Sequence, residues 1–369
     1  MQATSNFIPE KYTQNIENGC FEWSAPSNIA LVKYWGKRED LGHQIPANPS
    51  ISFTLNNCKT ITKLSFTKRD TSTPLNSNSD FSFELLFEGQ PKESFRPKIQ
   101  KFFERIAVYL PFLKDYHFVI DTQNTFPHSS GIASSASGMA ALAMNLMSLE
   151  KALNPSMTEE NFYQKASFLA RLGSGSACRS VKGSLVVWGN QNHIEGSSDL
   201  FGVEFPYEVH PIFKDYQDTI LLVDKGEKQV SSTVGHNLMH NHPYAERRFE
   251  QAHDNIDTLK TVFANGNTDE FIKIVESEAL TLHAMMMTSM PFFILMKPNT
   301  LEIINGIWKF RENTGIPVCF TLDAGANVHV LYPKEVSEKV LQFIKDELVV
   351  FCQNGQYICD EIGLGSIAL

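Results

Sequence analysis

Apolar and polar residues alternate in several short segments of the first third of the chain, as they do in strands that bury one face. The clearest are SISFTL at 50–55, TITKLSFT at 60–67 and FSFELLF at 81–87, where we expect half-buried antiparallel strands. The polar run TSTPLNSNSD at 71–80 predicts a surface loop, and YHFVIDT at 116–122 predicts a further strand. This part of the chain should therefore form a sheet with one face against a core.

Helix-forming residues dominate three of the segments that follow. These are 97–110, the Ala-, Met- and Leu-rich 139–153, and 161–172. Beyond a polar loop the pattern starts again with the strand DTILLVD at 218–224 and two predicted helices at 243–265 and 268–290. We therefore expect an α+β protein with two domains, residues 1–211 and 212–369.

Composition excludes several classes of protein. The chain has 369 residues, 42% of them apolar, and a formal net charge of −9, so it lacks the basic surface that nucleic acids or anionic membranes require. Two stretches without Asp, Glu, Lys or Arg, 122–149 and 279–296, are broken by polar residues or proline and predict no membrane span. The six cysteines form no C-x-x-C pair, which argues against disulfides and zinc, and we expect a cytoplasmic protein.

The stretch APSNIALVKYWGKRED at 25–40 places three cations next to two aromatic residues, namely Lys33, Lys37, Arg38, Tyr34 and Trp35. If this segment is helical, Lys33 and Lys37 project from the same side, close to Tyr34, because they are four residues apart. Two like charges so placed repel each other unless an anion lies between them. The stretch therefore predicts an anion site, and two lysines covering an apolar surface are the simpler alternative. For Arg38 we expect a surface pair with one of the two acidic residues that follow it.

A Ser- and Gly-rich run, SSGIASSASGMAALAMNL at 129–146, leads into the second predicted helix. Small residues let the backbone approach a ligand closely, and the start of a helix offers unpaired N–H groups and a positive dipole end to an anion. The Ser hydroxyls can reach a phosphate or its metal ion. No Lys follows the last Gly, so the run is not a Walker loop. It predicts a phosphate site, with an ordinary helix N-cap as the alternative.

Two further segments carry polar residues suited to substrate binding or catalysis. RLGSGSACRS at 171–180 places Arg179 beside small hydroxyl residues, where its guanidinium can hold a carboxylate through two parallel hydrogen bonds. A helix end with an ordinary surface Arg is the alternative. IPVCFTLDAGAN at 316–327 ends an apolar strand at Asp323, which can take a proton from a substrate hydroxyl or orient it, although most such segments are only turns.

Three histidines lie close together in GHNLMHNHP, namely His236, His240 and His242. Histidines four residues apart on a helix can share a zinc ion. No nearby acidic residue completes a catalytic H-E-x-x-H pattern, however. We therefore interpret this segment as a solvated helix.

Taken in this order, four of these segments resemble the diphosphomevalonate decarboxylases of the GHMP small-molecule kinase superfamily. The matching motifs are A-P-x-N-I-A-x-x-K-Y-W-G-K-R-D from Ala25, N-x-F-P-x-x-x-G-[LI]-A-S-S-A-x-G at 124–138, G-S-G-S-A-C-R-S at 173–180 and D-A-G-x-N at 323–327. Weaker similarity extends the matching region to residues 24–332. The chain departs from the family pattern at His236, where Met is common, and at Ala326, where Pro is usual.

The resemblance implies a two-domain GHMP-kinase-like fold, with an N-terminal domain like ribosomal protein S5, a ferredoxin-like C-terminal domain and the site in the cleft between them. It also implies ATP-dependent decarboxylation of (R)-5-diphosphomevalonate to isopentenyl diphosphate, in the mevalonate pathway of isoprenoid biosynthesis. ADP, phosphate and carbon dioxide are the other products. ATP, Mg²⁺ and this substrate are the expected ligands, and a homodimer is the expected assembly.

The matching motif positions imply the site residues. Asp323 and Lys33 are implied as the catalytic pair. The implied substrate-binding residues are Asn28, Tyr34, Lys37, Ser174, Ser176, Arg179 and Ser232. The implied ATP-binding residues are Gly131, Ala133, Ser134, Ser135, Ser137 and Gly138. Ser135 is also the implied ligand of the magnesium ion.

Three alternatives stay open. A phosphomevalonate decarboxylase would differ only in the pocket that binds the substrate's phosphate groups. A GHMP small-molecule kinase would release ADP without carbon dioxide. A non-catalytic binding protein of the same fold would be expected to have lost Asp323, Lys33 or Arg179, and this chain has all three.

Overall fold

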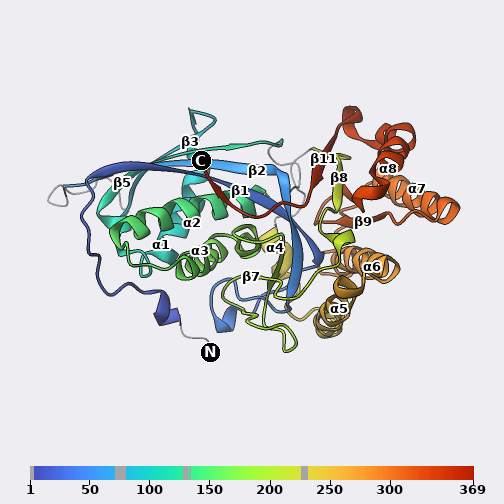
Figure 1. Ribbon diagram of the computed structural model, residues 1–369, viewed down its shortest axis with the longest axis horizontal. Coiled ribbons are helices and arrows are strands. Elements are labelled where there is room, and N and C mark those ends of the chain that lie inside the picture. Colours follow the sequence, from blue (N-terminus) through green and yellow to red (C-terminus); the bar gives the residue numbers. More distant parts are fainter. Residues whose placement is uncertain (1–3, 71–79, 128–131, 133, 226–231) are drawn as a thin grey trace.

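The computed structural model describes residues 4–70, 80–127, 132, 134–225 and 232–369, which form two sheets with helices packed against them (Figure 1). The larger sheet is made of β1 (Asn18–Val32), β2 (Ser50–Lys68), β3 (Ser82–Phe87), β4 (Gln90–Pro91), β5 (Tyr116–Asn124), β6 (Leu185–Trp188), β7 (Val203–Glu204) and β12 (Ile367–Ala368). The smaller sheet is made of β8 (Gln217–Leu221), β9 (Cys319–Leu322), β10 (Val328–Tyr332) and β11 (Tyr357–Glu361). Both sheets combine with helices, as the α+β prediction requires.

Strand pairing in the larger sheet follows the order β12-β1-β2-β5-β3-β4, with β6 beside β2 and β7 beside β6. The predicted strands at 50–55 and 60–67 are parts of the single strand β2, which is antiparallel to β1 and β5. The strand expected at 81–87 is β3. It pairs with β5 in parallel, so the expectation of an antiparallel strand is wrong for this pairing. A helix connects these two strands, and such a crossover returns the chain to the same end of the sheet.

The helices are α1 (Arg96–Ile106), α2 (Ser134–Leu153), α3 (Glu159–Gly173), α4 (Ser232–Asn237), α5 (Ala245–Asn265), α6 (Thr268–Met287), α7 (Pro298–Thr314) and α8 (Ser337–Phe343). Helices α1 to α3 cover one face of the larger sheet, and α5 to α8 gather around the smaller one (Figure 1). Helix α2 is buried on nearly every side because it packs against both the sheet and α3. Its high content of Ala, Leu and Met suits that position.

The long strands β1 and β2 contribute to two hydrophobic clusters. Leu64 and Phe66 of β2 pack with the helices on the larger sheet. Ile29 of β1 and Phe53 of β2 instead pack with the helices of the second half of the chain, including Phe271 of α6. The larger sheet and the second half of the chain therefore share a core.

The predicted division at residue 211 lies in a short 3-10 helix, Pro211–Phe213, just before β8. This boundary stays a prediction. The C-terminal strand β12 returns to the larger sheet, where Ala368 pairs with Trp23 of β1. The last residues of the chain therefore belong to the sheet formed by the first half.

Two expectations from composition can be compared with the structure. Among the described residues, no helix combines the length and the apolar character that crossing a membrane requires. None of the six cysteines forms a disulfide among the described residues.

Asp360 of β11 joins the two sheets by holding an irregular part of β2. Its Oδ1 accepts hydrogen bonds from the main-chain N–H groups of Asn56 (2.9 Å) and Asn57 (2.7 Å), and its Oδ2 accepts one from that of Cys58 (2.7 Å). These residues lie where the register between β1 and β2 shifts. The carboxylate therefore bonds N–H groups that the sheet leaves unpaired.

Replacing Asp360 should destabilise the protein. In Asp360→Ala the three N–H groups lose their acceptor, and we expect the free energy of unfolding to fall by roughly 2–4 kcal/mol. Urea denaturation followed by circular dichroism measures the change. Asp346→Ala is the control, because Asp346 is exposed and bonds only Gln342 among the described residues, and it should change the stability by less than about 0.5 kcal/mol. Equal effects of the two substitutions would contradict the role of Asp360.

Candidate active site

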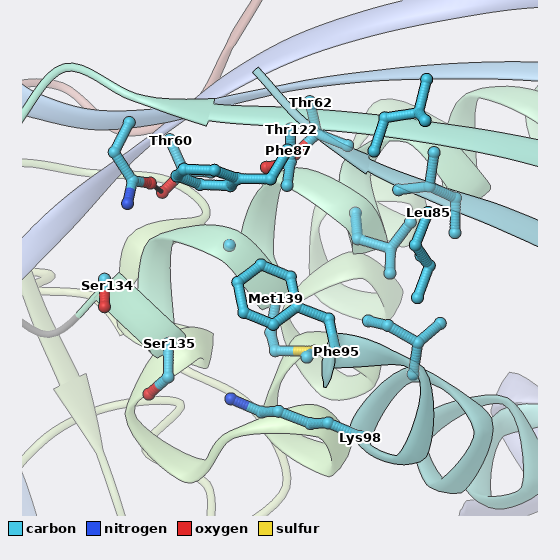
Figure 2. Close-up of a pocket in the computed structure, with 16 residues that line it drawn as sticks. Thr60, Thr62, Leu85, Phe87, Phe95, Lys98, Thr122, Ser134, Ser135 and Met139 are labelled. Atoms are coloured by element: carbon cyan, nitrogen blue, oxygen red, sulfur yellow. Dashed lines mark hydrogen bonds between the residues drawn. The ribbon is translucent and has the colours of Figure 1, made fainter. Parts of the chain in front are cut away.

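A cavity of about 150 Å³ lies between the larger sheet and helices α1 and α2 (Figure 2). Phe87 of β3 and Phe95 line it, and Lys98 of α1 extends its amine toward Ser135 at the start of α2. A cavity of this volume can hold a small aromatic ring. An aromatic lining with a cation at one end suits a flat ring that carries an anionic group.

The start of α2 forms the polar end of this cavity. Ser134 and Ser135 line it together with Gly138, beside which a Cβ atom would meet nothing within 4 Å. Ser137 faces the protein instead, because its buried hydroxyl lies 2.6 Å from the hydroxyl of Thr60 on β2. The helix start thus exposes two hydroxyls and a side of the backbone open to a ligand. Gly131 and Ala133 lie outside the described residues.

Ser135 connects the cavity to the predicted carboxylate-binding segment. Its hydroxyl lies 3.3 Å from that of Ser174, at the start of the 3-10 helix Gly175–Ser180. Ser176 of that helix is half-buried, and its carbonyl accepts a hydrogen bond from Asn28 Nδ2 at 3.1 Å. The predicted phosphate and substrate segments are therefore neighbours.

Arg179 and Asn28 lie together beneath this segment. Arg179 Nη2 is 3.3 Å from Asn28 Oδ1, and the guanidinium also donates to the hydroxyls of Ser50 (2.5 Å) and Ser52 (3.0 Å) of β2. Arg179 is only 2% exposed, so it is a buried cation and the surface-arginine alternative is wrong. Neutral hydroxyls and an amide orient the guanidinium without cancelling its charge, which leaves that charge available to a carboxylate.

Tyr34 packs between aromatic neighbours, with its ring centroid 4.5 Å from Trp188 and 4.1 Å from His236. A Cβ atom at Gly175 would come within 2.9 Å of Trp188, so this close packing requires glycine there. The Tyr34 hydroxyl is buried and has no hydrogen-bond partner among the described residues. It is therefore a donor whose hydrogen bond the described residues leave unmade.

His236 corrects the interpretation of the histidine segment as a solvated helix. Helix α4 ends at Asn237, and both His236 and His242 are buried. Nδ1 of His236 accepts the main-chain N–H of Gly36 at 3.1 Å, which leaves the ring proton on Nε2. Burial, with smaller contributions from Lys37 and Arg179, holds the pKa of His236 well below its usual range, so the ring is neutral.

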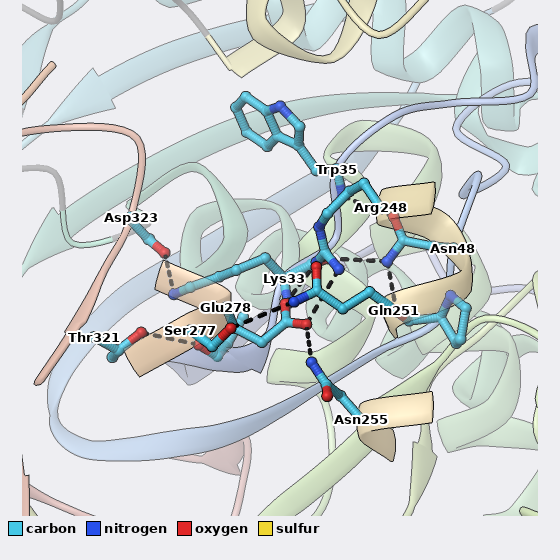
Figure 3. A network of polar contacts seen from close by, with 12 residues as sticks. Lys33, Trp35, Asn48, Arg248, Gln251, Asn255, Ser277, Glu278, Thr321 and Asp323 are labelled. Carbon is cyan, nitrogen blue, oxygen red and sulfur yellow. Dashed lines mark hydrogen bonds and ion pairs between the residues drawn. The ribbon is translucent and has the colours of Figure 1, made fainter. Parts of the chain in front are cut away.

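Lys33 and Asp323 meet at the ends of two strands, Lys33 directly after β1 and Asp323 directly after β9. Lys33 Nζ is 3.4 Å from Asp323 Oδ1 (Figure 3). The lysine side chain is 2% exposed and the aspartate side chain 30%, so a ligand can reach this pair from the Asp323 side. Burial lowers the pKa of Lys33, and the Asp323 charge opposes that shift.

The premise that residues 25–40 are helical is wrong, because β1 ends at Val32 and Lys33 follows it without a helix. Lys37 is half-buried and does not share a helix face with Lys33. Arg38 does not pair with the acidic residues that follow it, but with Asp199 at 3.0 Å. The three cations of this stretch therefore lie in three different environments.

His283 of α6 holds the loop that carries Asp323. Its Nε2 lies 3.1 Å from the Asp323 carbonyl oxygen, which also accepts the N–H of Gly325 at 2.7 Å. Burial lowers the pKa of His283 to about 4, so the ring is neutral at pH 7 and its Nε2–H can donate. The loop after β9 is thereby fixed close to Lys33.

The start of α2 is suited to a magnesium ion that arrives with a nucleotide. The described part of the chain contains no group of three or more His, Cys, Asp or Glu that could hold a metal ion. Mg²⁺ takes oxygen ligands, keeps several waters and is usually held by one or two protein groups together with phosphates. The exposed hydroxyl of Ser135, next to Ser174, fits that kind of shared ligation.

Sequence reasoning missed several residues of this region. Ser50 and Ser52 had a visible signal, because their hydroxyls alternate with the apolar Ile51 and Phe53 in a segment, 50–55, that predicts a strand. Lys98 and His283 have no such local signature, and only the packing of α1 and α6 places them at the site. The backbone of Ser232 begins α4, and nothing further is described for its side chain.

Family profiles match most of the chain. A diphosphomevalonate decarboxylase-like N-terminal domain matches residues 25–199, and a mevalonate 5-diphosphate decarboxylase C-terminal domain matches residues 219–362. The diphosphomevalonate decarboxylase of Ganoderma lucidum is 30% identical over 340 residues, which are 87% of this chain and 80% of that protein. The phosphomevalonate decarboxylase of Haloferax volcanii is 26% identical over 318 residues, or 86% of this chain and 89% of that one.

Solved structures match over almost the whole length. The mevalonate diphosphate decarboxylase of Staphylococcus aureus superimposes with a TM-score of 0.79 at 28% identity, over 95% of this chain and 98% of that one. A structure of MDDEF in complex with MVAPP, AMPPCP and magnesium gives a TM-score of 0.77 at 26% identity, with the same coverage. The expected mixed fold is therefore confirmed.

The pKa of His283 predicts that acid weakens the fold. The folded protein binds the His283 proton only near pH 4, whereas the unfolded chain binds it near 6.5, so the unfolded state takes up more protons between these values. The contribution of His283 should be intact above pH 6.5 and fall by on the order of 3 kcal/mol as the pH drops to 4. Urea unfolding over this range measures it, and His283→Gln should flatten the dependence. Identical slopes in both proteins would contradict the prediction.

Proposed function

The chain belongs to the diphosphomevalonate decarboxylase family, and we propose that it uses the site around Lys33 and Asp323 to decarboxylate 5-diphosphomevalonate with ATP. The products are isopentenyl diphosphate, ADP, phosphate and carbon dioxide, in the mevalonate pathway. The observation that carries the proposal is the 3.4 Å pair of Lys33 and Asp323, with the positive charge of buried Arg179 close enough to influence Lys33. Lys33 and Asp323 are thus proposed to contact the substrate hydroxyl, and Arg179 is proposed to bind the substrate carboxylate.

The substrate hydroxyl at C3 is a poor leaving group, so it must first be phosphorylated. The tertiary hydroxyl at C3 attacks the γ-phosphorus of ATP, so that an O–P bond forms and ADP departs. Loss of the new phosphate leaves C3 electron-deficient. The electrons of the bond to the carboxylate then form the double bond, and carbon dioxide leaves. No separate organic electron sink is needed for this sequence.

Asp323 is proposed to orient the C3 hydroxyl and accept its proton. Its position supports this role, because the carboxylate is partly exposed while its main chain is fixed by His283. Lys33 pairs with Asp323 and is proposed to stabilise the negative charge that develops during phosphoryl transfer. A buried lysine is well suited to this, since it acts through a low-dielectric surrounding.

The remaining predicted residues are proposed to hold the two ends of the substrate. Arg179 and Asn28 bind the carboxylate, as their contact and the burial of Arg179 support. The diphosphate is proposed to lie against Tyr34, Lys37, Ser174, Ser176 and Ser232. His236 packs on Tyr34 and offers an Nε2–H donor, so it belongs to the same anion pocket.

ATP is proposed to bind at the cavity beside α2. Its base is proposed to fit between the aromatic residues and its phosphates to meet the helix start, where Ser134, Ser135 and Gly138 line the cavity. Gly131, Ala133 and Ser137 are proposed for the same site from their place in the matching motif, Ser137 through its main chain, because its hydroxyl bonds Thr60. Lys98 is added to this set because its amine points to the same end of the cavity. Ser135 would help hold Mg²⁺, which supplies positive charge to the phosphates when bound.

Three broader proposals accompany this function. Residues 1–211 and 212–369 are proposed as the two domains, with β12 returning to the first. A homodimer is proposed as the assembly. The cytoplasm is proposed as the location, as the unpaired cysteines support.

The direct test is a turnover assay with Mg²⁺, ATP and either 5-diphosphomevalonate or 5-phosphomevalonate. We expect carbon dioxide and ADP in equal amounts, with a higher kcat/KM for the diphosphate. ADP without carbon dioxide would identify a kinase. A preference for the monophosphate in direct competition would identify the sister decarboxylase, and the absence of both products would leave a binding protein.

Replacing the proposed base should remove catalysis but not binding. In Asp323→Asn the hydroxyl loses its proton acceptor, and we expect kcat to fall by roughly 10²–10⁴-fold. The dissociation constant of 5-diphosphomevalonate, measured by calorimetry, should stay within about threefold of that of the unmodified protein. Asp346→Asn is a matched control on the surface and should leave both values unchanged. Loss of binding together with activity would speak against this role.

A further inference from the structure

A buried ion pair between α5 and α6 lies directly behind the proposed catalytic lysine (Figure 3). Arg248 donates from Nη1 to Glu278 Oε1 at 3.1 Å and from Nη2 to Glu278 Oε2 at 2.5 Å. The side chains are 1% and 0% exposed. Asn255 Nδ2 donates a further bond to Glu278 Oε1 at 2.6 Å. The carboxylate is thus fully bonded and rigidly held.

Both members of this pair also bond the main chain of Lys33. The Lys33 N–H donates to Glu278 Oε2 at 2.9 Å, and Arg248 Nη2 donates to the Lys33 carbonyl at 3.0 Å. Asn48 donates to the same carbonyl at 2.9 Å. Pairing between β1 and β2 has ended at Val32, so these side chains replace the bonds that a sheet would supply.

A purely structural explanation has to account for the burial of two charges. Removing an ion pair from water is costly, and apolar residues of similar volume often stabilise a fold as well or better. Apolar residues in these two positions would leave the N–H of Lys33 without its acceptor and its carbonyl with Asn48 alone. The pair is therefore matched to Lys33 and not only to the packing of α5 on α6.

We propose that Arg248 and Glu278 form a positioning pair. The pair fixes the main chain of Lys33 so that the Lys33 ammonium meets Asp323, and the Glu278 carboxylate places negative charge near that ammonium. The proposal rests on the catalytic roles given above to Lys33 and Asp323. Arg248 and Glu278 are shielded from the substrate, so they act through Lys33 and are not catalytic residues themselves.

The charges around Lys33 give the pair an electrostatic consequence. Titratable or charged groups face Lys33 from the Asp323 loop, from α5 and α6, from β8 and from the 3-10 helix 175–180. They are Asp323, Arg248, Glu278, His283, Asp218 and Arg179. Burial lowers the pKa of Lys33 most, Asp323 and then Glu278 raise it, and Arg179 lowers it. Neutralising Glu278 while Arg248 stays charged should therefore lower the pKa of Lys33 further.

The test compares kinetics of Glu278→Gln with those of the unmodified enzyme. Gln keeps an acceptor for the Lys33 N–H but removes the charge. We expect kcat for ADP release to fall by on the order of ten- to a hundredfold, because Lys33 is misplaced and less often protonated. The KM values of both substrates should stay within about threefold. The alkaline limb of the pH–kcat profile should move to lower pH, since the ammonium is lost at lower pH.

Two more substitutions separate position from charge. Glu278→Asp keeps the charge and should restore the alkaline limb, with only part of kcat. Arg248→Lys keeps a positive charge but loses the bidentate geometry, so kcat should fall while the alkaline limb stays in place. Because each substitution is conservative, at least one of them provides the comparison if Glu278→Gln does not fold.

The matched control is a second buried ion pair that touches none of the proposed site residues. Glu150 of α2 and Lys165 of α3 are 1% and 7% exposed, and their atoms Oε1 and Nζ are 2.5 Å apart. Glu150→Gln removes the same charge from an equally buried pair, so it should lower stability without moving the pH–kcat profile or kcat.

Each result decides between defined outcomes. An unchanged kcat and alkaline limb in Glu278→Gln would overturn the positioning role, as would an equal loss and shift in Glu150→Gln, which would indicate general destabilisation. Following ADP keeps this test separate from decarboxylation. An unmodified enzyme that releases ADP but no carbon dioxide overturns the proposed reaction and leaves the positioning role measurable. An unmodified enzyme that releases neither overturns both.

Discussion

A lysine ammonium buried at the end of β1 sets the main constraint on this structure. Removing Lys33 from water disfavours its charged form, so the fold must surround it with negative charge and fix its backbone. Asp323, in the loop after β9, contacts the Lys33 ammonium, and Glu278 of α6 accepts a hydrogen bond from the main-chain N–H of Lys33. Two segments that are distant in the chain therefore converge on Lys33, and their packing decides whether the site exists.

The length of β1 and β2 makes this convergence possible. The half of β2 that contains Leu64 and Phe66 packs against the helices that line the proposed nucleotide cavity. The halves that contain Ile29 of β1 and Phe53 of β2 pack against α5 and α6. The cavity and the substrate segment then meet where Ser135 lies 3.3 Å from Ser174. A phosphoryl donor bound on one side and an acceptor hydroxyl on the other would be brought together by two strands shared between both cores.

The chain is similar to both a diphosphomevalonate and a phosphomevalonate decarboxylase, so the choice between the two substrates would depend on the phosphate pocket proposed around Tyr34. There the chain has a histidine in contact with two aromatic rings, held neutral by burial. A neutral Nε2–H can bond a phosphate oxygen without adding charge, unlike the lysine at position 37. The proposed pocket therefore combines a neutral hydrogen-bond donor, His236, with the cation Lys37, and is not a cluster of cations alone.

The sequence by itself determined β2, β3, β5, β8 and β9, the helices α1, α2, α3, α5 and α6, and the motifs that contain Lys33, Arg179 and Asp323, because these depend on local periodicity and spacing. The helical premise for the segment around Lys33 and the antiparallel expectation for β3 toward β5 are wrong, since strand partners and chain direction depend on distant segments. Only the tertiary structure decided which charges face Lys33. Glu278 lies 245 positions and Arg248 215 positions away in the chain, and no local pattern relates residues so far apart. Arg248 and Glu278 become buried only when α5 and α6 pack together, and burial strengthens the hydrogen bonds that hold Lys33.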